Sequence, residues 1–241
     1  KEISKRYWLP ENLGECDRRQ YLDMSKLILM YQMAEISLEQ FRHLGFYALM
    51  NMQFSENELE NVQEEKMENI YVCAQLLDSF FTLDKDKKMH LVQDYIHNPI
   101  KNVKYKLQLF YGPKDGFEDI TWYQLIEGFG ELQSFNNSGK IECLVRLFAI
   151  FYRRKFESVK NIDLDKRVKF LEYLDIRYIY GFFLLFTSFF KFLTTESNIE
   201  IDGRAIDLSL LFTQKEDTEE DNVSVDLPEL GLRSTAFQMA E

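Results

Sequence analysis

Residues 178–190 read Tyr-Ile-Tyr-Gly-Phe-Phe-Leu-Leu-Phe-Thr-Ser-Phe-Phe, a run of 13 residues without a charged side chain between Arg177 and Lys191. A helix needs about 20 apolar residues to cross about 30 Å of hydrocarbon, whereas a run of about 10–14 is typical of a helix inside a protein core. We therefore predict a buried core helix at this position. A helix that presents its apolar side to a partner protein is one alternative, and a membrane-associated helix is another.

Helical patterns extend over most of the chain on the N-terminal side of this run. Residues 141–152 place apolar side chains at i, i+3, i+4 and i+7, which defines one apolar stripe on a helix. Side chains suited to N-capping precede the helical patterns, and 136–139 is predicted as a turn. The predicted starts are Asp17 (to about 33), Ser37 with Gln40 (to about 52), Ser55 with Glu58 (a segment that turns apolar up to Phe81), Thr121 (122 to about 135), Ser138 (to 154) and Asp163 (to about 193, with a break near 174–175).

Three short stretches have the character of β-structure instead. Residues 90–96 and 103–110 alternate apolar with polar side chains, and Asn98-Pro99 and Gly112-Pro113 are turn signals that follow them. A small sheet and isolated extended connections are both compatible with this pattern. Asp202-Gly203 between apolar residues favours a two-residue hairpin. The predicted fold class is mainly α, a multi-helix globular body with a small β element, formed by strands near 90–110 and a hairpin near 198–208.

The pattern divides the chain into four parts. We expect a helical body over 1–195 with a short extended insert near 83–113, a β-hairpin appendage over 196–213, an acidic linker over 214–229, and the start of a truncated helix over 230–241. Residues 214–241 hold eight acidic side chains against Lys215 and Arg233, so the linker is expected to be solvated and self-repelling.

Composition excludes several classes of protein. The chain has 241 residues, 46% of them hydrophobic and 15% aromatic, with 29 basic and 40 acidic side chains and a net charge of -11. This apolar content is too high for a wholly disordered chain, and the negative charge disfavours a general nucleic-acid binder. Cys16, Cys73 and Cys143 are odd in number and far apart, which indicates reduced thiols rather than a disulfide framework. Without a secretory signal, a cytoplasmic location is expected.

The search for catalytic chemistry finds no motif. His43, His90 and His97 are the three histidines, and none lies in a zinc-binding spacing. Phosphate-binding glycine loops and a nucleophile elbow are also absent from the sequence. We therefore predict no catalytic, cofactor-binding or metal-binding residues and no cofactor. An enzyme that pairs Asp or Glu with His90 or His97 in a polar pocket is a weaker hypothesis.

Protein binding is the function class that remains. The predicted partner surface lies on the apolar helices 138–154 and 176–193, and its candidate residues are Phe148, Phe151, Arg153, Phe183, Phe186 and Phe190. A basic cluster overlaps the end of the first helix and comprises Arg146, Arg153, Arg154, Lys155, Lys160, Lys166, Arg167 and Lys169. Cations at a helix C-terminus explain such a cluster, while an acidic partner or the chain's own acidic linker is the alternative.

Several short sequence motifs occur in a fixed order along the chain. They are Trp8-Leu-Pro-Glu11, Asn98-Pro99, Phe110-Tyr-Gly-Pro-Lys-Asp-Gly-Phe-Glu-Asp-Ile-Thr121, Leu144-Val-Arg-Leu-Phe-Ala-Ile-Phe-Tyr-Arg153 and Phe237-Gln-Met-Ala-Glu241. This order resembles tail-region proteins of phages and prophages of Bacteroidetes-type bacteria, although Arg154 stands where those proteins have Pro. The resemblance implies a non-enzymatic, virion-associated or tail assembly chaperone-like protein whose partner is a phage tail or tape-measure protein. A bacterial α-helical adaptor or regulatory protein unrelated to phage is the alternative.

Overall fold

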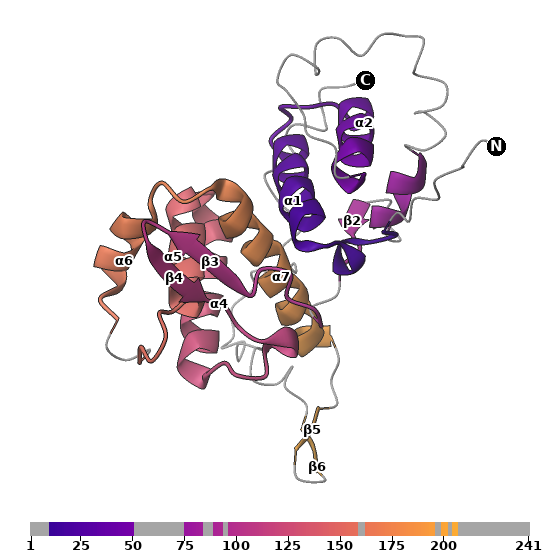
Figure 1. The fold of residues 1–241 in the computed structure, drawn as a ribbon. Coiled ribbons are helices and arrows are strands. Elements are labelled where there is room, and N and C mark those ends of the chain that lie inside the picture. The colour runs from indigo at the N-terminus through magenta and orange to yellow at the C-terminus, as the bar shows by residue number, and fades with distance from the viewer. Residues whose placement is uncertain are drawn as a thin grey trace, which may run out of the picture.

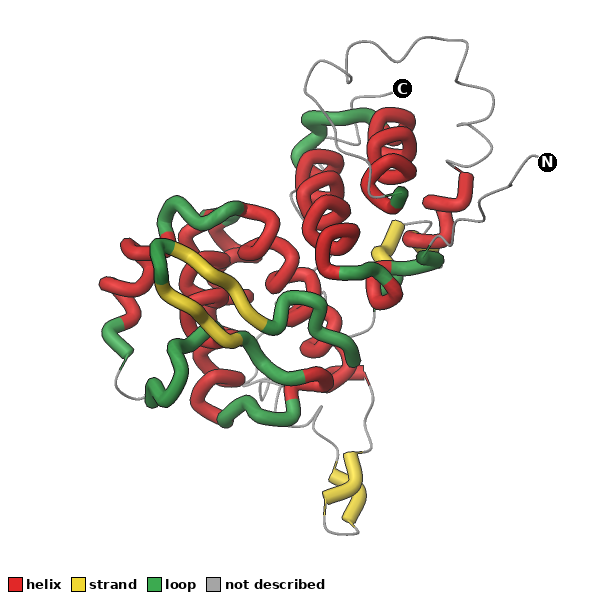
Figure 2. Tube along the Cα trace, in the orientation of Figure 1, coloured by secondary structure: helices red, strands yellow, loops and turns green. Residues whose placement is uncertain are grey.

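The structure is a computed structural model in which helices dominate, as predicted, and the strands form short antiparallel hairpins (Figures 1 and 2). It describes residues 10–50, 75–83, 89–93, 96–158, 162–195, 199–201 and 204–206. The predicted helix start at Ser55, the Asp202-Gly203 turn, the acidic linker over 214–229 and the helix start over 230–241 lie outside the described residues.

In the described part of the chain, two α-helices are followed by two β-hairpins, four further α-helices and a third hairpin. The α-helices are α1 (Arg18–Gln32), α2 (Leu38–Leu49), α4 (Trp122–Ser138), α5 (Ile141–Phe151), α6 (Leu164–Leu171) and α7 (Ile176–Thr195). The strands pair as β1 (Phe81–Leu83) with β2 (Met89–Leu91), β3 (Asn102–Tyr105) with β4 (Gln108–Tyr111), and β5 (Ile199–Ile201) with β6 (Arg204–Ile206). Short 3-10 helices cover Leu13–Glu15, Gln75–Phe80 and Asp115–Phe117.

The predicted helix starts are largely confirmed by capping geometry. Asp17, Ser37 and Thr121 each form a capping box with the glutamine three residues later, and Asp163 caps α6. Each box satisfies backbone N–H groups that the first helical turn leaves without a partner. The predicted break near 174–175 is also confirmed, because α6 ends at Leu171 and α7 begins at Ile176.

Two predictions about the α4–α5 connection are wrong. Helix α4 continues through Ser138, so residues 136–138 are helical and not part of a turn. Ser138 does not cap α5 either, since its hydroxyl donates to the carbonyl of Ser134 and α5 begins only at Ile141. The physical reason is Gly139, which adopts a left-handed φ of 66° and ends α4 by the usual glycine C-cap.

The extended region also differs from its prediction in detail. Residues 103–110, which alternate like one strand, fold back on themselves as the β3–β4 hairpin with Lys106 and Leu107 at the turn. In the described part of the predicted 90–96 stretch, only residues 90 and 91 are in a strand, β2, which pairs with β1. Phe81, expected at the end of a helical segment, begins that partner strand. The hairpin predicted near 198–208 is confirmed as β5–β6.

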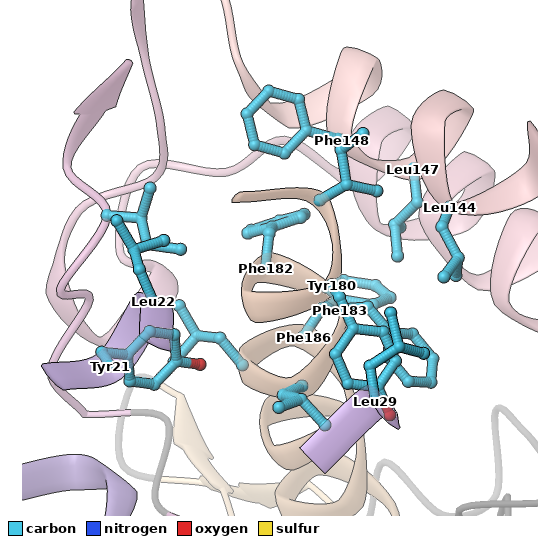
Figure 3. Close-up of a cluster of buried hydrophobic side chains, with 14 of the residues drawn as sticks. Tyr21, Leu22, Leu29, Leu144, Leu147, Phe148, Tyr180, Phe182, Phe183 and Phe186 are labelled. Atoms are coloured by element: carbon cyan, nitrogen blue, oxygen red, sulfur yellow. The ribbon is translucent and has the colours of Figure 1, made fainter. Parts of the chain in front are cut away.

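Helix α7, which contains the opening apolar run, occupies the centre of the core. Figure 3 shows Phe182, Phe183 and Phe186 between side chains of α1 on one side and of α5 on the other. Phe182 and Phe186 are fully buried. The stretch Ile176–Leu193 has a mean hydropathy of 1.3 and is long and apolar enough to cross a membrane, but 61% of it is buried inside this fold. The core-helix prediction is therefore confirmed.

Two glycines allow the helices to approach α7 closely. A Cβ at Gly181 would lie 3.0 Å from atoms of Ile100, Ser25 and Tyr21, and the Tyr21 hydroxyl donates to the Gly181 carbonyl at 2.8 Å. At Gly128 on α4, a Cβ would lie 2.7 Å from the Phe151 ring. These contacts are shorter than a methyl group tolerates, so the helix spacing depends on the missing side chains.

We expect Gly128→Ala to destabilise the protein by about 1–3 kcal/mol, because the Phe151 ring is packed against its neighbours and must move to admit a methyl group. The matched control is Gly130→Ala on the same helix, where nothing lies within 4 Å of the added Cβ. That change should stabilise the protein by up to about 1 kcal/mol through helix propensity alone. Urea unfolding of both variants measures the difference. Equal behaviour of the two would contradict the packing described here.

Candidate interaction surface

Five of the six predicted partner-binding residues lie in the core. Each is at most 5% exposed, and the aromatic rings contact one another across α4, α5 and α7. The five are Phe148, Phe151, Phe183, Phe186 and Phe190. The assignment of these rings to a partner surface is therefore corrected: helices of the same chain already cover them, because the apolar stripes of α5 and α7 face each other.

Arg153, the sixth predicted residue, lies beside an exposed surface at the β3–β4 hairpin. Its backbone forms an antiparallel bridge with Tyr111, in which the Tyr111 N–H donates at 2.7 Å and the Arg153 N–H donates at 3.0 Å. Directly opposite residues in such a bridge point to the same side. Arg153 therefore lies beside the end of β4 as an isolated bridge, and a turn that contains Lys155 and Phe156 follows it.

The two sides of the hairpin differ in chemistry. Val103 and Phe110 are each 1% exposed and point into the core, where Phe110 contacts Phe170 of α6. The alternation of side chains along a strand then places Lys104, Leu109 and Tyr111 on the outer side. Leu109 and Tyr111 are each 42% exposed. Lys104 and Leu109 are cross-strand partners, so a cation and an apolar side chain lie next to each other.

The hairpin turn presents an apolar side chain to solvent in a strained backbone conformation. Lys106 and Leu107 have φ of 44° and 63°, the left-handed values that a two-residue turn requires and that Asn-Gly usually supplies. Leu107 is 95% exposed. The Lys106 ammonium lies over the rings of Tyr105, Phe170 and Tyr173 at 5.0–5.9 Å, which ties the turn to the end of α6.

Phe156 repeats this combination in the neighbouring turn. It has a φ of 64° and is 94% exposed, with the Lys155 ammonium 5.0 Å from its ring. Glu157 holds the turn from inside, because it pairs with Arg167 and accepts the Arg154 N–H at 2.9 Å. Burial alone would raise the pKa of Glu157, but these hydrogen bonds outweigh it and lower the pKa below its ordinary value.

We call this surface the hairpin face. It consists of Lys104, Leu107, Leu109, Tyr111, Arg153, Lys155 and Phe156.

The predicted basic cluster separates into paired and unpaired cations. Arg146 pairs with Glu131 and Asp165, Arg154 and Arg167 pair with Glu157, and Lys166 pairs with Asp163. By contrast, Lys104, Arg153 and Lys155 have no ion-pair partner among the residues that the structure describes. Lys169, which belongs to the predicted cluster, and Lys106 at the hairpin turn also have no ion pair in the part of the chain that the structure describes. Lys160 lies outside the described residues.

A hydrogen-bonded clamp closes the base of the hairpin. The Asn98 side chain donates to the Pro113 carbonyl at 2.7 Å and accepts the Ile100 N–H at 2.8 Å. Asp115 accepts the Asn98 N–H at 2.9 Å and pairs with Lys101 at 2.8 Å. Burial tends to raise the pKa of Asp115, but the bonds from Lys101 and Asn98 lower it overall. The Asn98-Pro99 and Gly112–Asp115 motifs thus act together as the structural base of the hairpin.

The described residues do not form a site with evident catalytic or metal-binding chemistry. No group of three or more His, Cys, Asp or Glu side chains comes together in the described part of the chain. His97 Nδ1 lies 3.5 Å from Asp115, but both side chains are about half exposed in the clamp. A groove of about 610 Å³ between α5 and α6 has Val145 and Val168 in its lining, and its lining residues do not include His97. The His90 side chain lies outside what the structure describes.

Two features of the sequence bear on the hairpin face but are not visible in the apolar periodicity. Phe156 is a lone aromatic residue in a charged stretch, Arg154-Lys155-Phe156-Glu157, which has no helical apolar pattern to bury it. The exposed position of Leu107 is not predicted, because Lys106-Leu107 is not a usual turn sequence. Without Asn or Gly at the turn, residues 103–110 resemble one continuous strand.

Truncation of a core ring and of an exposed ring should differ strongly in effect. Phe186→Ala removes a fully buried side chain, and we expect it to lower the free energy of unfolding by about 3–5 kcal/mol. Phe156→Ala, the control, should change it by no more than about 0.5 kcal/mol because that ring is exposed. Chemical denaturation measures both. A small effect of Phe186→Ala would show that this ring is not part of the core.

Acid should destabilise the hairpin region through Asp115 and Glu157. Both have pKa values that folding lowers, so each contributes stability above its unfolded pKa of about 4 and loses it as the pH falls through the folded value. We expect unfolding midpoints to fall as the pH is lowered below about 4. Asp115→Asn should make this dependence shallower. An unchanged slope in Asp115→Asn would contradict the role given to the clamp.

No protein-family model matches the chain, and neither a curated protein nor a solved structure was found to be similar to it.

Proposed function

We propose that this chain is a non-enzymatic binding protein of phage or prophage tail assembly, and that a protein partner docks on the hairpin face. It would act in the cytoplasm of the host cell, with a phage tail or tape-measure protein as its partner. The proposed partner surface consists of the exposed side chains around β4 and residues 153–156, and the buried phenylalanines are not part of it. The fold of α1, α4, α5 and α7 then serves as the scaffold.

The observation that carries the proposal is the pair of exposed apolar side chains at positive φ. Left-handed backbone at a bulky residue costs on the order of 1–3 kcal/mol. Leu107 and Phe156 incur this cost while 95% and 94% exposed, so burial within the described chain does not offset it. Strained and exposed apolar residues are expected where a second molecule covers them.

The composition of the hairpin face also suits a protein interface. Tyr and Arg are enriched at the centres of interfaces, and Tyr111 and Arg153 lie side by side here. Each fully buried Leu or Phe side chain contributes about 1.5–3 kcal/mol of transfer free energy. Docking on Leu107, Leu109 and Phe156 would therefore supply several kcal/mol before the cost of association is subtracted.

The link to phage tails comes from the resemblance noted in the sequence. Two of its phrases, Asn98-Pro99 and Phe110–Thr121, meet in the clamp at the base of the hairpin. Part of the resemblance thus consists of residues that position the proposed docking surface. This supports a shared binding role. A bacterial α-helical adaptor unrelated to phage, binding through the same surface, is the alternative.

Affinity capture from cells that carry the phage or prophage tests the proposal. The intact chain should recover a tail or tape-measure protein, and Leu107→Asp with Phe156→Asp should abolish recovery, since a carboxylate cannot enter an apolar contact without a large desolvation cost. Ile126→Asp is the matched control, because Ile126 on α4 is 65% exposed but lies outside the hairpin face.

The outcomes separate the candidate functions. Recovery of host proteins alone, lost in the hairpin-face variant, would favour the adaptor. If the intact chain recovers neither class, or if Ile126→Asp loses the partner as completely as the hairpin-face variant, the proposed docking surface is wrong. Thermal melts of all three proteins confirm that the substitutions leave the fold intact.

A further inference from the structure

We infer that the hairpin face binds the chain's own acidic segment, residues 216–229. The inference takes the docking surface from the proposed function and names a ligand for it. In this arrangement the segment occupies the surface when no partner is bound.

The first argument is the unbalanced charge of the surface. Lys104, Arg153 and Lys155 have no ion-pair partner in the described part of a chain whose net charge is -11. Nearby, Lys101 is paired with Asp115, and Arg154 and Arg167 are paired with Glu157, so these three cations are already neutralised by carboxylates of the chain. An occupant that complements this surface must therefore carry several negative charges. It must also carry apolar side chains, because Leu107, Leu109 and Phe156 are interspersed with the cations.

The second argument is the sequence of the segment. Residues 216–229 read Glu-Asp-Thr-Glu-Glu-Asp-Asn-Val-Ser-Val-Asp-Leu-Pro-Glu, with seven acidic side chains and no basic one. Val223, Val225 and Leu227 recur at every second position, so an extended backbone places all three on one side. The segment thus offers an acidic half followed by an apolar edge. The hairpin face has the complementary chemistry.

A short connection joins the segment to the described part of the chain. Ile206 is the last described residue, and the ten residues from there to Glu216 can span up to about 33 Å. A covalent connection of this length raises the local concentration of the segment at the surface to about the millimolar range. A weak electrostatic contact is then sufficient for substantial occupancy.

Zero-length carbodiimide crosslinking of the full chain, read by mass spectrometry, tests the inference. We expect Lys104 and Lys155 to be joined to carboxylates of 216–229 at low salt. Lys169, an exposed lysine of α6 outside the hairpin face, should not be joined to them. At about 0.5 M NaCl the crosslinks should be lost, since the Debye length falls to a few ångströms.

Two further samples identify the occupant. A mixture of isotope-labelled and unlabelled chains distinguishes a contact within one chain from a contact between two copies, and crosslinks only between differently labelled chains would overturn the inference. In the variant Leu107→Asp with Phe156→Asp, the crosslinks from Lys104 and Lys155 should also be lost. Equal crosslinking of Lys104, Lys155 and Lys169, or none, would overturn it as well.

These results are independent of whether a phage partner exists. If affinity capture recovers no partner, the crosslinks still report whether the segment occupies the surface. If the segment does not crosslink while partner capture still depends on Leu107 and Phe156, the inference fails and the proposed function stands. If the segment crosslinks and the partner is also captured, the acidic segment competes with the partner. Replacing Glu216, Glu219 and Glu220 by Gln, and Asp217 and Asp221 by Asn, should then increase partner capture.

Discussion

The burial of α7 between α1 and α5 is the constraint on which the rest of the structure depends. Figure 3 shows its Phe182, Phe183 and Phe186 between side chains of α1 and of α5, so the positions of these two helices depend on contact with the rings of α7. Close approach is achieved by the absence of side chains at Gly181 and Gly128. Phenylalanine rings are large and rigid, and a core made of them tolerates little displacement. The same packing that stabilises the fold removes these rings from any role at the surface.

The β3–β4 hairpin is attached to this core by one apolar side and by its base. Val103 and Phe110 are buried, and the Asn98–Asp115 clamp ties the two ends of the hairpin together. With both inner side and base committed, the outer side and the turn are the parts left for a ligand. The left-handed backbone at Leu107 and Phe156 is held by ion pairs and cation–π contacts around it. Such support allows strained residues to persist in a folded protein.

A surface of this kind suits both an external partner and an internal competitor. In the proposed role, the apolar side chains would supply binding energy and the cations would favour an acidic ligand. An acidic segment tethered to the same chain would occupy the surface until a partner with better contacts displaces it. It would also shield strained apolar side chains from solvent in the absence of a partner.

The sequence by itself determined the helical class, most helix starts and the break before α7. These follow from local patterns, because capping residues and apolar periodicity act within a few residues of each other. It did not determine that 103–110 turns back at Lys106-Leu107, since this turn lacks the residues that normally announce it. Nor could it decide whether the phenylalanines of α5 and α7 face the core or a partner protein, since an apolar helical stripe has the same spacing in both cases. Only tertiary structure decided that distinction. Whether an apolar side chain is covered depends on which distant segment packs against it, and that pairing of α7 with α1 and α5 is not encoded in any local pattern.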